Sequence, residues 1–226
     1  ITHKEDITSF AFSPDGKFIL TTSNDKTACL WNTQTGKLHQ TYHHNAQVAS
    51  GRFSQRGKTL ATGSSDATAK VWNIKSGKLL KTLIGHQDKV NFVRFINKGK
   101  ELITGSDDQT IIHWNIKSGE VKKSFLGHIN GARKGFYLPK KKILLTLGND
   151  RVIKIWQLKT GQLLGDLYLA LEEKNTWLFV TPDGKFDGNK KGFDHLHYIK
   201  NVFEVVSLPA NLPNRVPGLL KKILSR

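Results

Sequence analysis

The chain has 226 residues, a formal net charge of +17 and one cysteine. A single cysteine excludes an internal disulfide, and no zinc-ligand spacing of Cys and His occurs. No apolar run is long enough to span a membrane and no signal peptide is visible, so the composition favours a cytoplasmic protein with a buried core.

Four segments of the chain restate one another. They are SNDKTACLWN (23–32), SSDATAKVWN (64–73), SDDQTIIHWN (106–115) and GNDRVIKIWQ (148–157). Their tryptophans lie 41, 42 and 42 residues apart. A repeat of this length is one supersecondary unit that cannot bury its own apolar face, so neighbouring units must stack to form a core.

Each repeat contains four short apolar runs separated by turn residues. In the third repeat they are VNFVRF (90–95), ELITGS (101–106), TIIHWN (110–115) and EVKKSFL (120–126). Their length and their β-branched and aromatic content are typical of strands. The Gly, Asn, Asp and Ser residues between them favour tight turns. We therefore predict four antiparallel strands in each repeat.

Two further residues recur at fixed spacing. An Asp lies six residues before each Trp, and a His lies 22 residues before each Asp. With PDGK turns at 14–17 and 182–185, this pattern resembles the WD-repeat β-propeller family, whose blades have four strands. The resemblance implies an all-β propeller with blades at about 1–43, 44–85, 86–127 and 128–170, followed by a partial closing blade and a tail over 171–226.

In that family each blade holds a hydrogen-bonded tetrad in which Trp donates to a hydroxyl, the hydroxyl to His, and His to the turn Asp. The resemblance assigns these roles to His3, Ser23, Asp25 and Trp31; to His44, Ser64, Asp66 and Trp72; to His86, Ser106, Asp108 and Trp114; and to His128, Asp150 and Trp156. Such groups resemble a catalytic triad, but the pattern supplies no pocket or oxyanion site, and an enzyme has no reason to repeat its site. We therefore predict a structural role and no catalytic residue, metal, cofactor or small-molecule substrate.

The fourth repeat departs from the pattern. Gly148 stands where the other repeats have Ser, so we expect this blade to lack its hydroxyl and to be the loosest. His113 falls in a column otherwise filled by Leu30, Val71 and Ile155, which predicts a buried, hydrogen-bonded core histidine and not a metal ligand.

The last 50 residues carry a second resemblance. The segment TWLFVTPDGKFDG (176–188) repeats the first half of a blade, and VPGLLKKILSR (216–226) predicts a short amphipathic helix. Trp177, Thr181, Pro182, Gly184 and Asp187, with Pro217, Leu219, Leu220, Ile223 and Leu224, resemble the segment that closes the propeller in bacterial multidomain WD-repeat proteins. Some of those proteins join a propeller to a caspase-like peptidase domain, whose signature does not occur here.

Four and a half blades, a start at Ile1 and the lack of methionine suggest a fragment of a larger propeller, with a smaller closed ring as the alternative. In a fragment the first blade would have an unpaired edge that favours association between copies.

The alternation of turns sorts the charges between two ends of each blade. The tetrad end carries the turn Asp residues, and just before them lie our candidate partner-binding residues Asn24, Ser65, Asp107 and Asn149. The lysine end carries the PDGK-type and SGK-type turns. Its candidate basic face comprises Lys58, Lys75, Lys98, Lys100, Lys117, Lys140, Lys141 and Lys142.

The leading functional hypothesis is a non-enzymatic scaffold that presents loops at the tetrad end to a protein partner. The first alternative is the sensing or autoinhibitory arm of a larger enzyme, such as a caspase-like peptidase. The second is non-specific binding of nucleic acid or another anionic surface at the lysine end, which the scarcity of Arg and of interleaved aromatic residues disfavours.

Overall fold

The computed structural model describes residues 3–170, 176–188 and 215–225. The chain divides into two units, Ile1–Phe136 with Gly148–Asp150 and Tyr137–Leu147 with Arg151–Arg226. Strands make up most of the described residues of both units, so the predicted all-β class is confirmed. In the described part of the chain, no helix has the length and apolarity needed to cross a membrane.

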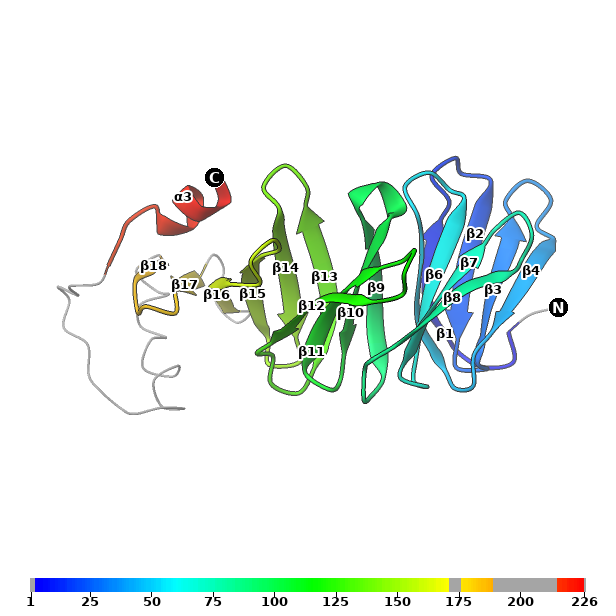
Figure 1. Ribbon diagram of the computed structural model, residues 1–226, viewed down its shortest axis with the longest axis horizontal. Helices are drawn as coiled ribbons and strands as arrows, with labels where there is room; N and C mark the ends of the chain where they lie inside the picture. The colour runs from blue at the N-terminus through cyan, green and yellow to red at the C-terminus, as the bar shows by residue number, and fades with distance from the viewer. Residues whose placement is uncertain (1–2, 171–175, 189–214, 226) are drawn as a thin grey trace. The chain divides into compact units, whose positions relative to one another are not determined.

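Unit one contains three sheets, each built from four consecutive antiparallel strands (Figure 1). Blade one has β1 (Ile7–Phe12), β2 (Phe18–Ser23), β3 (Thr27–Asn32) and β4 (Leu38–His43). Blade two has β5 (Val48–Phe53), β6 (Thr59–Ser64), β7 (Thr68–Asn73) and β8 (Leu79–Ile84). Blade three has β9 (Val90–Ile96), η1 (Asn97–Gly99), β10 (Glu101–Ser106), β11 (Thr110–Asn115) and β12 (Val121–Leu126). The four runs predicted for the third repeat match these bounds to within one residue.

The core of unit one lies between its blades. Leu20 and Tyr42 of blade one form a buried cluster with Val48 and Leu60 of blade two, and an equivalent cluster joins blades two and three. The blades approach so closely that a Cβ added to Gly51 on β5 would lie 2.7 Å from the Leu20 Cδ2 atom. Stacking of neighbours therefore buries the faces that a single repeat leaves open.

The face of β1 that would pack on a preceding blade is exposed. Ile7, Phe10 and Phe12 have exposed fractions of 59%, 68% and 60%. The equivalent face of β5 carries the fully buried Val48, which packs on blade one. Blade one therefore presents to solvent an apolar face of the kind that its neighbours bury.

The fourth sheet has six strands in the order β13-β14-β15-β16-β17-β18. They are β13 (Ala132–Leu138), β14 (Ile143–Gly148), β15 (Val152–Gln157), β16 (Leu163–Ala170), β17 (Thr176–Val180) and β18 (Phe186–Gly188). The segment predicted as a partial closing blade thus forms a hairpin on the outer edge of this sheet, with β17 antiparallel to β16. Strand β16 has eight residues, against six in β4, β8 and β12, and offers a longer edge for pairing.

The predicted amphipathic helix is present as α3 (Leu219–Ser225). Its apolar residues pack against a cluster in unit two formed by Ile143, Ile155 and Phe179. The helical residues in this contact are Leu219, Leu220, Ile223 and Leu224. The Val216 N–H donates to the Phe186 carbonyl oxygen over 2.9 Å, which ties the start of this segment to β18. The aromatic segment 195–209, which the resemblance treats as a linker, lies outside the described residues.

Candidate functional site

A hydrogen-bonded line of side chains crosses the middle of each blade in unit one. In blade three the Trp114 indole Nε1 donates to Thr104 Oγ1 over 2.8 Å, and Thr104 Oγ1 lies 2.7 Å from His86 Nε2. The His86 Nδ1 atom lies 2.8 Å from Asp108 Oδ2. Blade two repeats this line with distances of 2.9, 2.7 and 2.9 Å, and blade one with 2.8, 2.7 and 2.9 Å.

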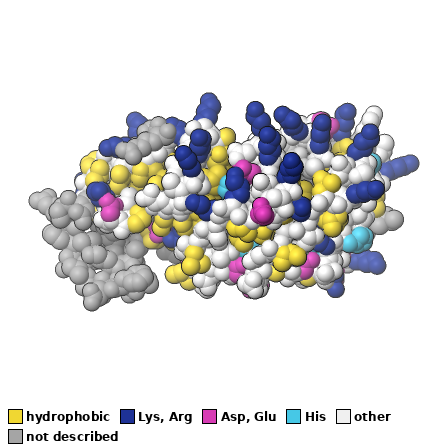
Figure 2. All heavy atoms as spheres, in the orientation of Figure 1, with side chains coloured by type: hydrophobic (Ala, Val, Ile, Leu, Met, Phe, Trp, Pro, Cys, Tyr) yellow, Lys and Arg dark blue, Asp and Glu magenta, His cyan; other side chains and the backbone are white. Residues whose placement is uncertain are grey.

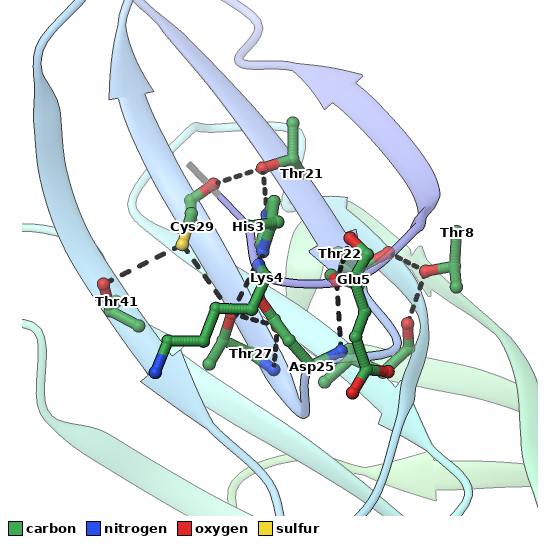
Figure 3. Close-up of polar contacts among 12 residues, drawn as sticks. His3, Lys4, Glu5, Thr8, Thr21, Thr22, Asp25, Thr27, Cys29 and Thr41 are labelled. Carbon is green, nitrogen blue, oxygen red and sulfur yellow. Dashed lines mark hydrogen bonds and ion pairs between the residues drawn. The ribbon is translucent and has the colours of Figure 1, made fainter. Parts of the chain in front are cut away.

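The hydroxyl of the line belongs to threonine, so the serine assignment of the sequence analysis is corrected. In blade one Thr21, and not Ser23, lies between the histidine and the tryptophan, as Figure 3 shows for His3 and Thr21. The equivalent residues are Thr62 and Thr104, which replace Ser64 and Ser106 in this role. A sequence signal for them exists: a threonine lies ten residues before each of the four repeat tryptophans, including Trp156, whereas the serine column is interrupted by Gly148.

The serines have a different structural role. Ser106 Oγ donates to the Asp88 carbonyl oxygen over 2.9 Å and accepts the Asp108 N–H over 3.1 Å. Ser23 and Ser64 make the equivalent pairs of bonds. Each serine therefore joins the turn between the second and third strands to the loop that follows the histidine.

The turn aspartate accepts more hydrogen bonds than the histidine alone provides. Asp66 Oδ2 accepts the Asn45 N–H over 3.0 Å, and its Oδ1 accepts the Thr68 hydroxyl over 2.6 Å and the Thr68 N–H over 3.0 Å. Burial opposes ionisation of this carboxyl, but the bonds from Thr68, His44 and Asn45 outweigh it and lower the pKa of Asp66 from 3.8 to about 2. The carboxylate form is the one that these donors hold in place.

One order of protons satisfies every member of the line. The indole of Trp114 can only donate, so Thr104 accepts from it and can give its own proton to His86 Nε2. His86 then donates from Nδ1 to Asp108 as a neutral imidazole. Burial lowers the pKa of His86 and outweighs the opposing effect of Asp108, which agrees with the neutral form.

The fourth repeat keeps the threonine and tryptophan bond. Trp156 Nε1 donates to Thr146 Oγ1 over 2.8 Å, so the expectation that this blade lacks its hydroxyl is wrong. Next to Gly148, His128 Nδ1 lies 3.2 and 3.0 Å from the two carboxylate oxygens of Asp150. A Cβ added to Gly148 would lie 2.3 Å from His128 Nδ1 and 2.5 Å from Asp150 Oδ1. The serine of the other repeats therefore does not fit here.

The four candidate residues at the tetrad end lie in turns of one design. In each turn one backbone N–H donates to the carbonyl oxygen of the residue just before the first strand of the blade, over 2.8 to 3.0 Å. The donors are Asn24, Ser65, Asp107 and Asn149, and the acceptors are Asp6, Gln47, Lys89 and Gly131, respectively. The side chains differ in what they contact. Asp107 Oδ1 accepts from Asn91 Nδ2 over 2.6 Å, and Asn149 Nδ2 donates to the Asn130 carbonyl oxygen. Asn24 and Ser65 are half-buried.

The lysine end gathers the positive charge. The two turns of each blade meet there, as the bond from the Thr33 N–H to the Lys17 carbonyl oxygen shows for blade one. Lys58, Lys75, Lys98, Lys100 and Lys117 of unit one are exposed, and Figure 2 shows Lys and Arg side chains along this edge. In unit two, Lys140 and Lys142 are exposed and Lys141 is half-buried.

His113 and Cys29 are both buried. His113 Nε2 lies 2.8 Å from Glu101 Oε2, which makes it the hydrogen-bonded core histidine that its column predicts. Burial lowers the pKa of His113 and raises the pKa of the Cys29 thiol. Neither residue offers an exposed reactive group. Among the described residues, no cluster of three His, Cys, Asp or Glu is arranged to hold a metal ion.

The fold agrees with comparisons to known proteins. Residues 1–32, 36–73 and 77–115 match the family described as WD domain, G-beta repeat. The matched residues therefore consist of WD repeats, and the fold of the described residues is that of WD-repeat β-propellers, a class that typically binds proteins and is generally non-catalytic.

Two solved structures are similar to the chain. "Crystal structure of RRP9 WD40 repeats" matches with a TM-score of 0.68 and 20% identity, over 79% of this chain and 58% of that one. "Structure of U3-55K" matches with a TM-score of 0.70 and 21% identity, over 85% of this chain and 63% of that one. The chain thus spans less than two thirds of either structure, and the likeness shows the fold alone. None of the curated proteins compared with the chain matches it.

Proposed function

We propose that the chain is a non-enzymatic scaffold that binds a protein partner at its tetrad end. The observation that supports this proposal is the repetition of one rigid turn at that end of the blades. In unit one each such turn is held by the aspartate of the tetrad, by a serine and by a backbone bond across to the preceding loop. Loops that are already ordered lose little conformational entropy on binding, which favours affinity.

The tetrad end also carries an apolar contact point. Ile129 follows His128, its N–H donates to Asp150 Oδ2 over 3.0 Å, and its side chain is 59% exposed. The turn residues at the same end of the blades, Asn24, Ser65, Asp107 and Asn149, are polar. An apolar centre within a polar rim is the usual composition of a protein interface. Ile129 therefore extends the candidate partner-binding set beyond the four turn residues.

The test is a pull-down from native lysate with nuclease treatment and a salt series, using Asn24→Arg with Ser65→Arg. These positions are better probes than Asp107, whose side chain supports the Asn91 amide. Lys75→Glu with Lys117→Glu, at the lysine end, is the control. We expect discrete proteins that resist salt, are lost with the arginine variant and are retained by the control. Partners that survive the arginine substitutions and are lost with the control would place binding at the other end.

A second candidate function is binding of an anionic surface, such as nucleic acid, at the lysine end. The exposed lysines of unit one favour it because clustered like charges attract polyanions over long range. Binding of this kind would be non-specific and steeply salt-dependent. A gel-shift series with random-sequence duplex DNA would show it, and equal affinity of the Lys75→Glu, Lys117→Glu variant would contradict it.

A third proposal is that the chain serves as the sensing arm of a larger bacterial enzyme. Its support is the resemblance of the closing segment, whose Trp177 and Leu219 belong to one cluster in unit two. Sequencing of the flanking open reading frame tests it. A Cys and His pair in an adjoining α/β domain is the expected result, and flanks without such a domain would contradict it.

A further inference from the structure

The first strands of the four repeats line a cavity that neither the tetrads nor the blade ends explain. Its volume is about 490 Å³, and its residues come from β1, β5, β9 and β13, all within unit one. Small-molecule sites typically measure about 300–1,000 Å³. Thr8, Ser50 and Asn91 contribute polar groups to its wall. The cavity is therefore large enough for a compact ligand.

The cavity is strongly cationic. Its lining includes Arg52, Lys89, Arg94, Arg133 and Lys134, and none of its lining residues is Asp or Glu. Within the part of the chain that the structure describes, no ion pair joins any of these five residues to a carboxylate. Uncompensated charge of one sign in a concave site concentrates the electric field and attracts ligands of the opposite sign.

Two of the arginines are held in place by the fold. Arg52 Nη1 donates to the Gly51 carbonyl oxygen over 2.7 Å, and the Arg94 guanidinium lies 5.3 Å from the centroid of the Phe136 ring. Burial and the charge of Arg94 lower the pKa of Arg52, so the two cations disfavour each other. These contacts orient the guanidinium groups without neutralising them. A bound anion would remove the repulsion.

The packing of the blades does not require these charges. Arg52 and Arg94 occupy a column that holds Ala11 in blade one and Phe136 in the fourth repeat. By contrast, the column that packs between blades holds the buried apolar residues Val48 and Val90. This column varies between repeats, so packing does not require arginine there, yet adjacent blades two and three both have it. We take this as an indication that the two arginines bind a ligand.

We propose that this cavity binds a small molecule with at least two phosphate groups. The guanidinium group of arginine presents paired donors that match phosphate oxygens. Several cations in a few hundred Å³ match the charge density of a compact polyphosphate better than that of an acidic peptide, whose carboxylates are spread along an extended chain. The proposal is independent of docking at the tetrad end.

Isothermal titration of the 226-residue chain with inorganic tripolyphosphate, at about 0.15 M NaCl to screen diffuse attraction, tests it. Arg133→Gln with Lys134→Gln removes two exposed charges from the cavity, and Lys75→Gln with Lys117→Gln removes two exposed charges from the lysine end. We expect saturable binding of one tripolyphosphate, weakened at least roughly tenfold by the cavity variant and less than about twofold by the control.

A second variant tests the geometry of recognition. Arg94→Lys keeps the charge but loses the planar fork, so we expect weaker tripolyphosphate binding with an unchanged tryptophan indole spectrum, which reports the fold. If the cavity variant and the control variant lost the same affinity for tripolyphosphate, net charge alone would explain the binding and the proposal would be overturned. Failure to saturate, or tighter binding of an oligoglutamate of equal charge, would overturn it as well.

Discussion

Removal of the threonine hydroxyl in one tetrad should uncouple the tryptophan from the histidine. Thr104→Val preserves shape and volume but deletes the atom that accepts from Trp114 Nε1 and contacts His86 Nε2. Thr104 is fully buried, so water has no direct route to either partner. Each buried group left without a partner costs about 1–3 kcal/mol, and the two together predict a loss of about 2–6 kcal/mol in unfolding free energy.

Urea unfolding with linear extrapolation measures the loss, and the indole N–H signal of Trp114 in a proton–nitrogen NMR spectrum identifies its origin. Ser106→Ala is the matched variant, because Ser106 is equally buried but bonds only to backbone groups. It should leave the Trp114 indole signal in place and cost about 1 kcal/mol for each lost bond. An unmoved indole signal in Thr104→Val, together with a shifted one in Ser106→Ala, would refute the assignment.

Four further predictions follow from local geometry. Gly148→Ser restores the residue of the other repeats but should lower the melting temperature, because its Cβ would overlap His128; a higher value would contradict the close approach. Ala67→Gly should raise urea stability by about 0.5–1 kcal/mol, since Ala67 has a φ of 61°. In the folded protein the pKa values of His44 and Asp66 both lie below their ordinary 6.5 and 3.8, so the unfolded chain binds more protons in acid. The unfolding free energy measured by denaturant titration should therefore fall below about pH 6.5, where His44 acts, and again between about pH 4 and 2, where Asp66 acts. A stability that does not change with pH would exclude this linkage. Phe10→Glu should reduce concentration-dependent self-association in analytical ultracentrifugation, because Phe10 is 68% exposed on blade one.

Periodicity predicted the strands of unit one, and the resemblance to the WD-repeat family identified three members of each tetrad. The Trp, Asp and His columns are visible because each residue type is uncommon and recurs at fixed spacing. The hydroxyl was assigned to the wrong column because Thr21 and Ser23 lie two residues apart on β2 and therefore on the same face of the strand. Sequence spacing does not determine which of the two oxygens faces the indole. The complete threonine column was the better signal.

Other features depend on tertiary contacts that a repeat pattern does not encode. The close approach of His128 and Asp150 to Gly148 leaves no space for a side chain there, and a column alignment records this only as a missing hydroxyl. The cationic cavity gathers residues from four repeats, and Arg52, Arg94 and Lys134 are far apart in the sequence, with Lys134 in a different column from the two arginines. Their convergence appears only when the first strands lie side by side.

Each blade of unit one contains a hydroxyl, a histidine and an aspartate at the distances of a hydrolase triad. The burial and the hydrogen bonds of the hydroxyl indicate that the three groups stabilise the blade. In blade two the Thr62 hydroxyl lies 2.7 Å from His44 Nε2, and His44 Nδ1 lies 2.9 Å from Asp66. A nucleophile, however, needs an accessible oxygen with a free lone pair. Thr62 is fully buried, and the Trp72 indole donates to its oxygen over 2.9 Å. The tryptophan that makes the repeat recognisable thus also occupies the oxygen atom that a nucleophile would have to expose.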